Sequence, residues 1–197
     1  MLDAATRCFA RSGFGGVSMD EIADEVGVTK PMLYAYFASK DGLYAACIER
    51  TGAPLMAALR TAIDPAASPE GQLWSGLLAF FAHVEEHRDE WRAFYLDAST
   101  HGGAPAEQVA QMRRELTSTL TALLTHAATT AGVAADLAPE MEAQARALIG
   151  ATEALAAWWI GHPNDATREL LALRLMNFAW MGFGDLLDGR FWLPAPG

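Results

Sequence analysis

The amino-acid sequence predicts an all-α protein of about nine helices, and three observations lead to this class. No stretch of β-branched residues alternates in polarity between turns, as a strand requires. Apolar residues instead recur at helical spacing along the chain, and glycine or proline separates successive segments. The 197 residues are 52% hydrophobic, which is too apolar for a disordered chain and enough for a buried core. We expect an N-terminal three-helix head over residues 1–45 and a larger helical body over residues 46–197.

The first three predicted helices are short, and their ends carry recognisable signals. A helix over about residues 2–12 stops at a glycine. Ser18 and Glu21 have the spacing of a capping box, which predicts a second helix that ends at Gly27. A very short third helix follows, over about residues 29–37, with a threonine cap and a proline in its first turn.

Six further helices are predicted for the rest of the chain. Apolar stripes and flanking glycine or proline residues place them at about 39–63, 69–84, 91–102, 105–131, 139–160 and 165–187. The eighth presents a row of small residues, and the ninth is apolar on nearly all sides. Together these two helices predict a dimer interface of four helices from two subunits, and the alternative is a core within one chain. The small residues are Ala143, Ala147, Gly150, Ala151 and Ala154.

Composition limits the cell compartment and the partners. No run approaches the roughly 20 apolar residues of a membrane span, and the N-terminus lacks the apolar core of a signal peptide, so we expect no membrane partner. The two cysteines, Cys8 and Cys47, cannot form a disulfide framework, which favours the cytoplasm. We interpret both as small buried apolar residues, with redox sensing as the alternative.

The net charge of −10 argues at first against nucleic acid, because phosphate repels an acidic protein. The charge is unevenly distributed. Residues 1–50 carry five Lys or Arg against seven Asp or Glu, and residues 51–197 carry nine against seventeen. Most of the negative excess therefore lies in the body. The composition excludes a protein that coats DNA by bulk charge, and it leaves room for one that binds a specific site.

The two short helices joined at Gly27 form a candidate helix-turn-helix, in which the second helix enters the major groove. The segments SMDEIA at 18–23, GVTKPMLYAYF at 27–37 and SKDGLY at 39–44 resemble the signature of the tetracycline-repressor (TetR) family of regulators. The resemblance covers about residues 2–48. Beyond that, only the number and length of the helices are similar.

The resemblance implies that the head binds double-stranded DNA. Lys30 matches the start of the recognition helix and is the best candidate for base readout, because lysine donates to guanine O6 or N7. Tyr34 and Tyr36 match positions that contact phosphate or the groove wall. Lys40 and Ser18, at the N-termini of helices, match phosphate contacts. The expected DNA-binding residues are Ser18, Thr29, Lys30, Pro31, Met32, Tyr34, Tyr36 and Lys40.

Family members usually carry a basic stretch ahead of the first helix, whereas this sequence begins almost inside it. Either an N-terminal arm is missing from the sequence, or the protein relies on it less.

The resemblance also implies a homodimer and an effector pocket enclosed by the fifth to eighth helices. We expect a repressor that a small, largely apolar effector releases from a palindromic operator, with no cofactor. Aromatic side chains in these helices are candidates for the pocket, although aromatic stripes more often form core. The candidate ligand-binding residues are Phe80, Phe81, Trp91, Phe94, Tyr95, Trp158 and Trp159.

Two other classes of function stay open. The segment His83 to His87 reads H-x-x-E-H, a zinc-hydrolase pattern in which two histidines share a helix face and Glu86 serves as base. No third ligand is evident in the sequence, so we expect neither a metal site nor an enzyme. The other alternative is a helical ligand-binding or adaptor protein whose head has lost DNA binding.

Overall fold

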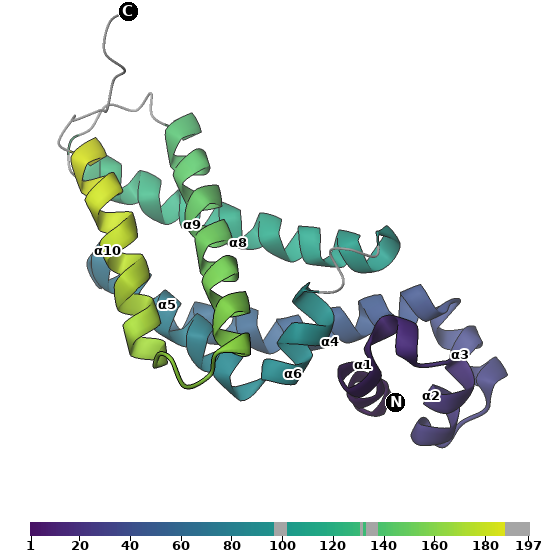
Figure 1. Ribbon diagram of the computed structural model, residues 1–197. Helices are drawn as coiled ribbons and strands as arrows, with labels where there is room; N and C mark the ends of the chain where they lie inside the picture. Colours follow the sequence, from purple (N-terminus) through teal and green to yellow (C-terminus); the bar gives the residue numbers. More distant parts are fainter. Residues whose placement is uncertain (97–101, 131, 133–137, 188–197) are drawn as a thin grey trace, which may run out of the picture. The chain divides into compact units, whose positions relative to one another are not determined.

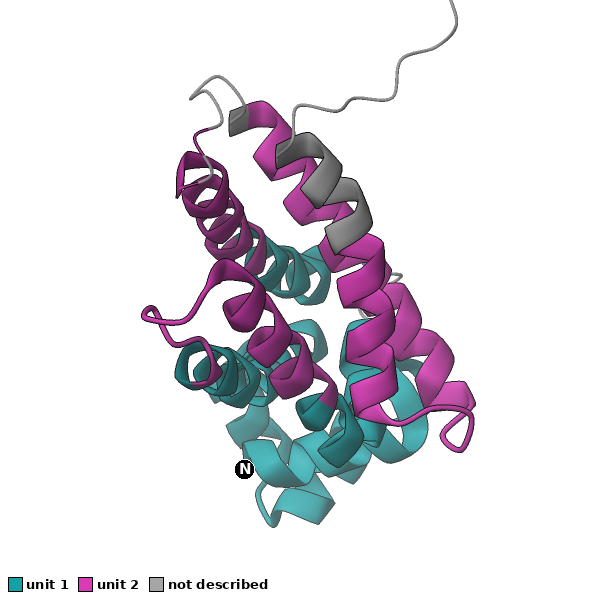
Figure 2. Ribbon diagram, turned by 90° about the vertical axis from the view of Figure 1, so that its left-hand side faces the viewer, with its two compact units in different colours: residues 1–61, 82–114 teal, residues 62–81, 115–197 magenta. Residues whose placement is uncertain are grey.

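The structure is a computed structural model that describes residues 1–96, 102–130, 132 and 138–187. Within these ranges the chain forms nine α-helices and one π-helix and no strand, which confirms the all-α class. No helix in this part of the chain is long and apolar enough to cross a membrane. The chain divides into two compact units, residues 1–61 with 82–114 and residues 62–81 with 115–197 (Figure 2). The predicted boundary at residue 45 falls inside the first unit and stays a prediction.

The head has the expected succession of short helices, which Figure 1 shows in purple and dark blue. The capping box is present: Glu21 N–H donates to Ser18 Oγ at 3.2 Å, and Ser18 N–H donates to a Glu21 carboxylate oxygen at 2.7 Å. The predicted stop at Gly13 is instead a break inside the first helix, where φ is +68° before a further turn is added. The four helices are α1 (Leu2–Gly16), α2 (Met19–Val26), α3 (Lys30–Phe37) and α4 (Lys40–Ala62).

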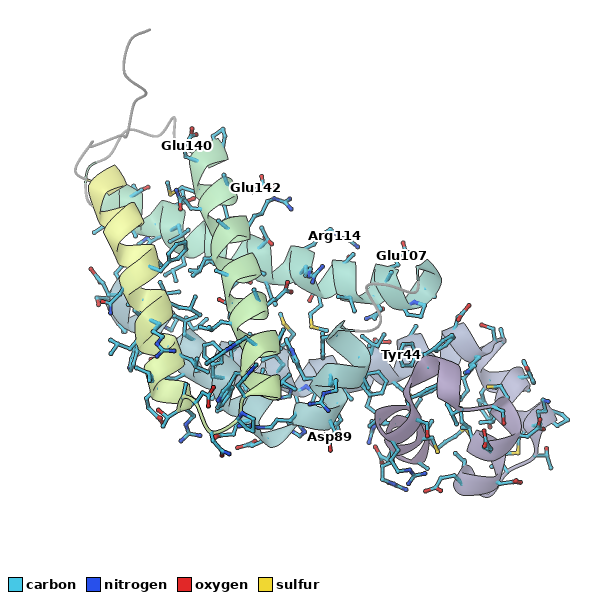
Figure 3. All side chains as sticks on the ribbon, viewed as in Figure 1. Tyr44, Asp89, Glu107, Arg114, Glu140 and Glu142 are labelled. Carbon is cyan, nitrogen blue, oxygen red and sulfur yellow. The ribbon has the colours of Figure 1, made fainter. Side chains whose placement is uncertain are left out.

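An aromatic cluster forms the core of the first unit. The ring centroid of Phe9, on α1, lies 4.7 Å from that of Tyr44 on α4 and 6.4 Å from that of Phe94. Tyr44, which Figure 3 labels, donates a hydrogen bond from its hydroxyl to the carbonyl oxygen of Ala93. Residues near position 94 therefore complete the packing of the first and fourth helices, and these aromatic residues are buried.

The predicted sixth helix is two elements in the structure. A four-residue helix, α6 (Arg88–Trp91), leads into a π-helix, η1 (Arg92–Leu96), and the predicted continuation to residue 102 falls largely outside the described residues. A π-helix has wider turns than an α-helix, so the apolar residues on it change direction. The preceding helix is α5 (Pro69–Glu86), and the following one is α8 (Gly103–Thr130).

The second unit is built around the antiparallel helices α9 (Ala138–Gly161) and α10 (Arg168–Leu187), which lie side by side in Figure 1. Small apolar residues fill the contact between α8 and α9, with Leu124 and Met141 as the larger members of the cluster. At the other end of α9, Trp159 packs edge-on against Phe81 and donates its indole N–H to the Ala166 carbonyl oxygen at 2.8 Å.

Candidate nucleic-acid interface

The turn between α2 and α3 is held by backbone hydrogen bonds. Gly27 has φ +78° and ψ +33°, a left-handed conformation that glycine adopts without steric cost. Its N–H donates to the carbonyl oxygen of Ala23 at 2.9 Å, and the N–H of Val28 donates to the same oxygen at 3.0 Å. Ile22 on α2 and Leu33 on α3 are fully buried. The two helices are therefore joined by a rigid turn and anchored on a shared core, as a helix-turn-helix requires.

The third helix keeps its apolar and aromatic side chains at the surface. Of its eight residues only Leu33 is buried. Met32 is 43% exposed, Tyr34 42% and Tyr36 67%. Thr29 and Pro31 are exposed as well, and the Thr29 hydroxyl makes no capping hydrogen bond. With Lys30, which is also exposed, six of the eight predicted DNA-binding residues thus lie on the outer surface of the start and body of α3.

Lys30 is held by a carboxylate from the neighbouring helix. Its Nζ lies 2.7 Å from Oδ2 of Asp20, the second residue of α2, and both side chains are exposed. The hydrogen bond to this carboxylate, together with its negative charge, raises the pKa of Lys30 above its ordinary value. The ammonium is therefore restrained near the start of α3 and stays charged at neutral pH.

Lys40 lies over an aromatic ring. Its Nζ is 4.5 Å from the ring centroid of Phe14, a cation–π distance. Phe14 itself packs on Tyr44, with centroids 5.0 Å apart, and follows the break at Gly13. The ring therefore supports the lysine stem at the first residue of α4. Ser18, the remaining predicted phosphate contact, is exposed at the N-cap of α2.

The other cations of residues 1–50 are engaged in ion pairs. Arg7 and Arg11 on α1 both reach Glu25 on α2, at 3.9 Å and 3.3 Å. Arg50 on α4 lies 2.6 Å from Asp3 on α1. Four of the five Lys and Arg residues in this region therefore hold a carboxylate, and Lys40 lies on a ring instead. Residues 1–50 therefore carry little uncompensated positive charge.

Comparison with known proteins decides the family. The family model described as bacterial regulatory proteins, tetR family, matches residues 1–47, and the tetracyclin repressor-like C-terminal domain matches residues 69–182. The chain belongs to the TetR family. Its members are transcriptional regulators, so this chain is a TetR-family DNA-binding transcriptional regulator.

Relatives extend over nearly the whole chain. A TetR-like transcriptional regulator from Rhodococcus sp. RHA1 is 37% identical, with a TM-score of 0.74 and 93% of each chain covered. The transcriptional activator FasR from Mycolicibacterium smegmatis is 27% identical over 92% of this chain and 80% of its own length. FadR from Bacillus subtilis, solved in complex with stearoyl-CoA, has a TM-score of 0.77 at 15% identity, covering 90% of this chain and 95% of its own. At that identity the likeness shows the fold alone.

The candidate ligand-binding residues of this TetR-family chain fall into separate groups. Phe94 belongs to the aromatic core with Phe9 and Tyr44. Trp91 and Tyr95 stack on each other in the first unit, with centroids 4.1 Å apart. In the second unit, Phe80, Phe81 and Trp159 form another cluster, and Trp158 is 37% exposed on α9 beside His162.

Among these residues Tyr95 has a distinctive chemistry. Its hydroxyl is buried and finds no hydrogen-bond partner among the described residues. The nearby Thr51 hydroxyl donates instead to the carbonyl oxygens of Cys47 and Ile48. Burial raises the pKa of Tyr95 far above its ordinary value, so the hydroxyl keeps its proton. A buried phenol of this kind can donate to a polar group on a bound molecule.

The H-x-x-E-H segment has no metal-site geometry in the described part of the chain. No group of three His, Cys, Asp or Glu side chains there is placed to hold a metal ion. The rings of His83 and His87 lie 4.5 Å apart between centroids, and His87 Nδ1 contacts Glu90 at 3.4 Å. Burial and then the charge of His87 lower the pKa of His83 to about 4. The two histidines therefore pack against each other at the end of α5.

Proposed function

We propose that this TetR-family regulator binds a palindromic operator as a homodimer and represses transcription until a small, largely apolar effector releases it. The observation that carries the proposal is the exposed row on α3. Met32, Tyr34 and Tyr36 stay at the surface of an eight-residue helix beside Lys30. Exposed apolar side chains concentrated on one short helix indicate a binding surface, and the major groove admits one helix.

The two lysines have different roles in this proposal. Lys30 donates to base edges and specifies sequence, whereas Lys40 contacts phosphate and contributes affinity on any duplex. The test is selection of duplexes from a random library, followed by fluorescence anisotropy with the selected duplex, a scrambled duplex and DNA flanking the gene. Lys30→Ala should relax the sequence preference, and Lys40→Ala should weaken binding to all duplexes alike.

Arg60→Ala, which removes an exposed cation from the far end of α4, is the matched control and should leave both properties unchanged. Failure to select any duplex would contradict DNA recognition and favour the adaptor alternative. Equal effects of both lysine variants on specific and scrambled DNA would contradict the division of roles.

The homodimer is proposed from an apolar surface on α9 and α10. The small residues of α9 at 143, 147, 150 and 154 are exposed, and on α10 Leu173 is 48% and Phe178 63% exposed. An open groove of about 360 Å³ runs along this surface, and its lining residues are Ala151, Ala154, Leu155, Trp158, Leu175 and Phe178. Small residues permit close approach of a second pair of helices, so we infer that a second copy covers the surface.

Sedimentation velocity tests this interface. Replacing Ala154 by Arg together with Phe178 by Asp should convert the dimer to a monomer, because both charges would be buried in the contact. Affinity for a two-site operator should then fall to that for a single half-site. Ala122→Arg, at an exposed position of α8, is the control. A double variant that still sediments as a dimer would place the interface elsewhere.

The effector in this proposal is a small, largely apolar molecule. Within the first unit, the stacked Trp91 and Tyr95 and the buried Tyr95 hydroxyl support a largely apolar molecule with at least one polar atom. Because FadR from Bacillus subtilis was solved with stearoyl-CoA, that compound is a suitable first probe. A probe that weakens operator binding must itself bind less tightly to the DNA complex by the same factor. A reporter gene placed behind the selected operator then distinguishes repression from activation.

A further inference from the structure

Asp20 lies outside the predicted site and contacts one of its two lysines directly. It occupies the first turn of α2, and its carboxylate oxygen lies 2.7 Å from Nζ of Lys30 at the first residue of α3. Asp20 is 66% and Lys30 44% exposed, so the pair is accessible to a ligand at the surface. An exposed ion pair is weak and reversible in water. The ion pair with Asp20 therefore restrains the Lys30 ammonium and still lets it donate to a ligand.

The restraint affects base edges and phosphates differently. An ammonium has three donors, so Lys30 can keep one hydrogen bond to Asp20 while it donates to neutral guanine O6 or N7. A move of the Lys30 ammonium to a phosphate oxygen is less favourable than donation to a base edge. It requires Lys30 either to leave Asp20 or to bring a phosphate close to the carboxylate, where the two negative charges repel.

The charges of residues 18–40 make the restraint of Lys30 by Asp20 important for DNA binding. Between residues 18 and 40 the only Lys or Arg residues are Lys30 and Lys40, whereas Asp20, Glu21, Asp24 and Glu25 are all acidic. Lys30 therefore supplies half of the positive charge of the helix-turn-helix. The partner that holds it has a large influence on the attraction of this surface for DNA in general.

We propose that Asp20 is a positioning residue that increases discrimination between the operator and other DNA, by keeping the Lys30 ammonium on base edges and away from phosphates. The inference rests on the proposed function, because it requires that α3 reads DNA. Asp20 itself need not contact the duplex, since it acts through Lys30.

The experiment uses the full chain and two duplexes of equal length and composition, one selected by the wild-type protein and one scrambled. Anisotropy gives the dissociation constants between 50 and 200 mM KCl. The variants are Asp20→Asn, Asp20→Glu, Lys30→Ala and the double variant Asp20→Asn with Lys30→Ala. Asp24→Asn removes the same charge four residues later on α2 and is the matched control.

We expect Asp20→Asn to tighten binding to the scrambled duplex about 3- to 10-fold and to change binding to the selected duplex less than about 2-fold. The slope of log K against log salt on scrambled DNA should steepen by about 0.9 for each head, the value for one added phosphate contact. Asp20→Glu should retain most of the discrimination. In the Lys30→Ala background, Asp20→Asn should leave the ratio of the two affinities unchanged.

The measurements distinguish the control, a failure of the inference and a failure of the proposed function. Asp24→Asn should change the dissociation constants for both duplexes by the same factor, whether Lys30 is present or replaced by Ala. The inference is overturned if Asp20→Asn also changes the affinities for both duplexes by the same factor. It is likewise overturned if Asp20→Asn changes the ratio of the two affinities in the Lys30→Ala background. If the wild-type protein selects no duplex, the proposed function fails and the inference fails with it. Circular dichroism confirms that each variant is folded, which the exposure of Asp20 leads us to expect.

Discussion

Backbone conformation distinguishes two residues that end neighbouring short helices. Gly27 follows α2 with φ +78°, and Ala38 follows α3 with φ +58° and ψ −34°. A side chain at positive φ is strained, because its Cβ crowds the adjacent backbone carbonyl. The chain is therefore relaxed at the turn inside the helix-turn-helix and strained at the turn that follows it.

Exchanging the two residue types should change stability in opposite directions. Gly27→Ala should lower the free energy of unfolding by about 1–2 kcal/mol, because it introduces the strain. Ala38→Gly should raise it by up to about 1 kcal/mol, because it removes the strain at some cost in unfolded-state entropy. Urea unfolding measures both values. A loss of stability in both variants would contradict this account of Ala38.

Stability should depend on pH through His83. Its pKa is lowered to about 4 in the folded state from an ordinary value of 6.5, so the folded protein keeps it neutral while the unfolded chain protonates it. The associated stability is fully present above pH 6.5 and is lost as the pH falls towards 4. The loss should approach about 1.4 kcal/mol for each pH unit and total about 2–3 kcal/mol.

Urea unfolding at intervals between pH 7 and pH 4.5 tests this dependence. His83→Gln should flatten the dependence relative to the wild-type protein, since glutamine does not titrate. His126→Gln, at an exposed position of α8, controls for removal of one imidazole. Parallel profiles for wild type and His83→Gln would exclude His83 as the source.

At the scale of single residues, the motif predicted which positions of α3 are exposed, and the structure agrees for Met32, Tyr34 and Tyr36. The motif did not indicate which residues contact Lys30 and Lys40. Asp20 precedes Lys30 by 10 residues and Phe14 precedes Lys40 by 26, and no helical spacing links such pairs. Only the packing of α2 against α3, and the break at Gly13, bring them together.

At the scale of the elements, the helices α3 and α4 meet closely at their junction. Ser39 Oγ accepts the N–H of Gly42 at 3.0 Å and so caps α4. A Cβ added at Gly42 would lie far inside van der Waals contact with the carbonyl oxygen of Phe37. The absence of a side chain at this position therefore lets the last turn of the recognition helix meet the first turn of α4.

Gly42→Ala should force these two helix ends apart. We expect a loss of about 1–3 kcal/mol in the free energy of unfolding, as for overpacking, together with weaker DNA binding because Lys40 moves. Gly15→Ala is the control, since a Cβ there meets no atom within 4 Å. Thermal unfolding and anisotropy measure the two effects. A stable Gly42→Ala protein with unchanged DNA affinity would contradict the argument.

Sequence signals at helix ends predicted most elements well, because capping chemistry is local. The capping box of Ser18 and the left-handed turn at Gly27 are examples. The predicted sixth helix was wrong in its internal structure. Trp91, Phe94 and Tyr95 continue an α-helical spacing in the sequence, yet the structure changes from α6 to a π-helix at Arg92. A change in hydrogen-bonding register leaves the order of residue types unaltered, so periodicity does not detect it.

At the scale of the whole molecule, the charge pattern predicts a shallow salt dependence of operator binding. A dimer would present ten Lys and Arg side chains from its two 1–50 regions, and ten phosphate contacts would give a slope of about −9. Because four of five in each region already hold carboxylates, one cation in each region and two in the dimer remain, and we expect a slope of about −2. Titrations at several KCl concentrations measure it. Glu25→Gln, which releases Arg7 and Arg11, should steepen it.

The division into compact units was beyond the reach of the sequence. The motif ends near residue 48, which suggested a head that is independent of later residues. The structure groups residues 82–114 with residues 1–61. This grouping depends on contacts such as Phe9 with Phe94, which are 85 residues apart in the sequence, with α2 to α6 between them. Apolar periodicity shows that both residues are core candidates, and it does not show that they meet.

The hydrogen bond from Tyr44 to Ala93, with Phe94 beside it, also has a consequence for biosynthesis. A ribosome that has released only the first 50 residues has released the DNA-binding motif but not the residues that close its core. Phe9 and Tyr44 then lack their contact with Phe94 until about 45 more residues emerge, which takes several seconds at usual elongation rates. The nascent chain should therefore become competent for DNA only after η1 has left the exit tunnel.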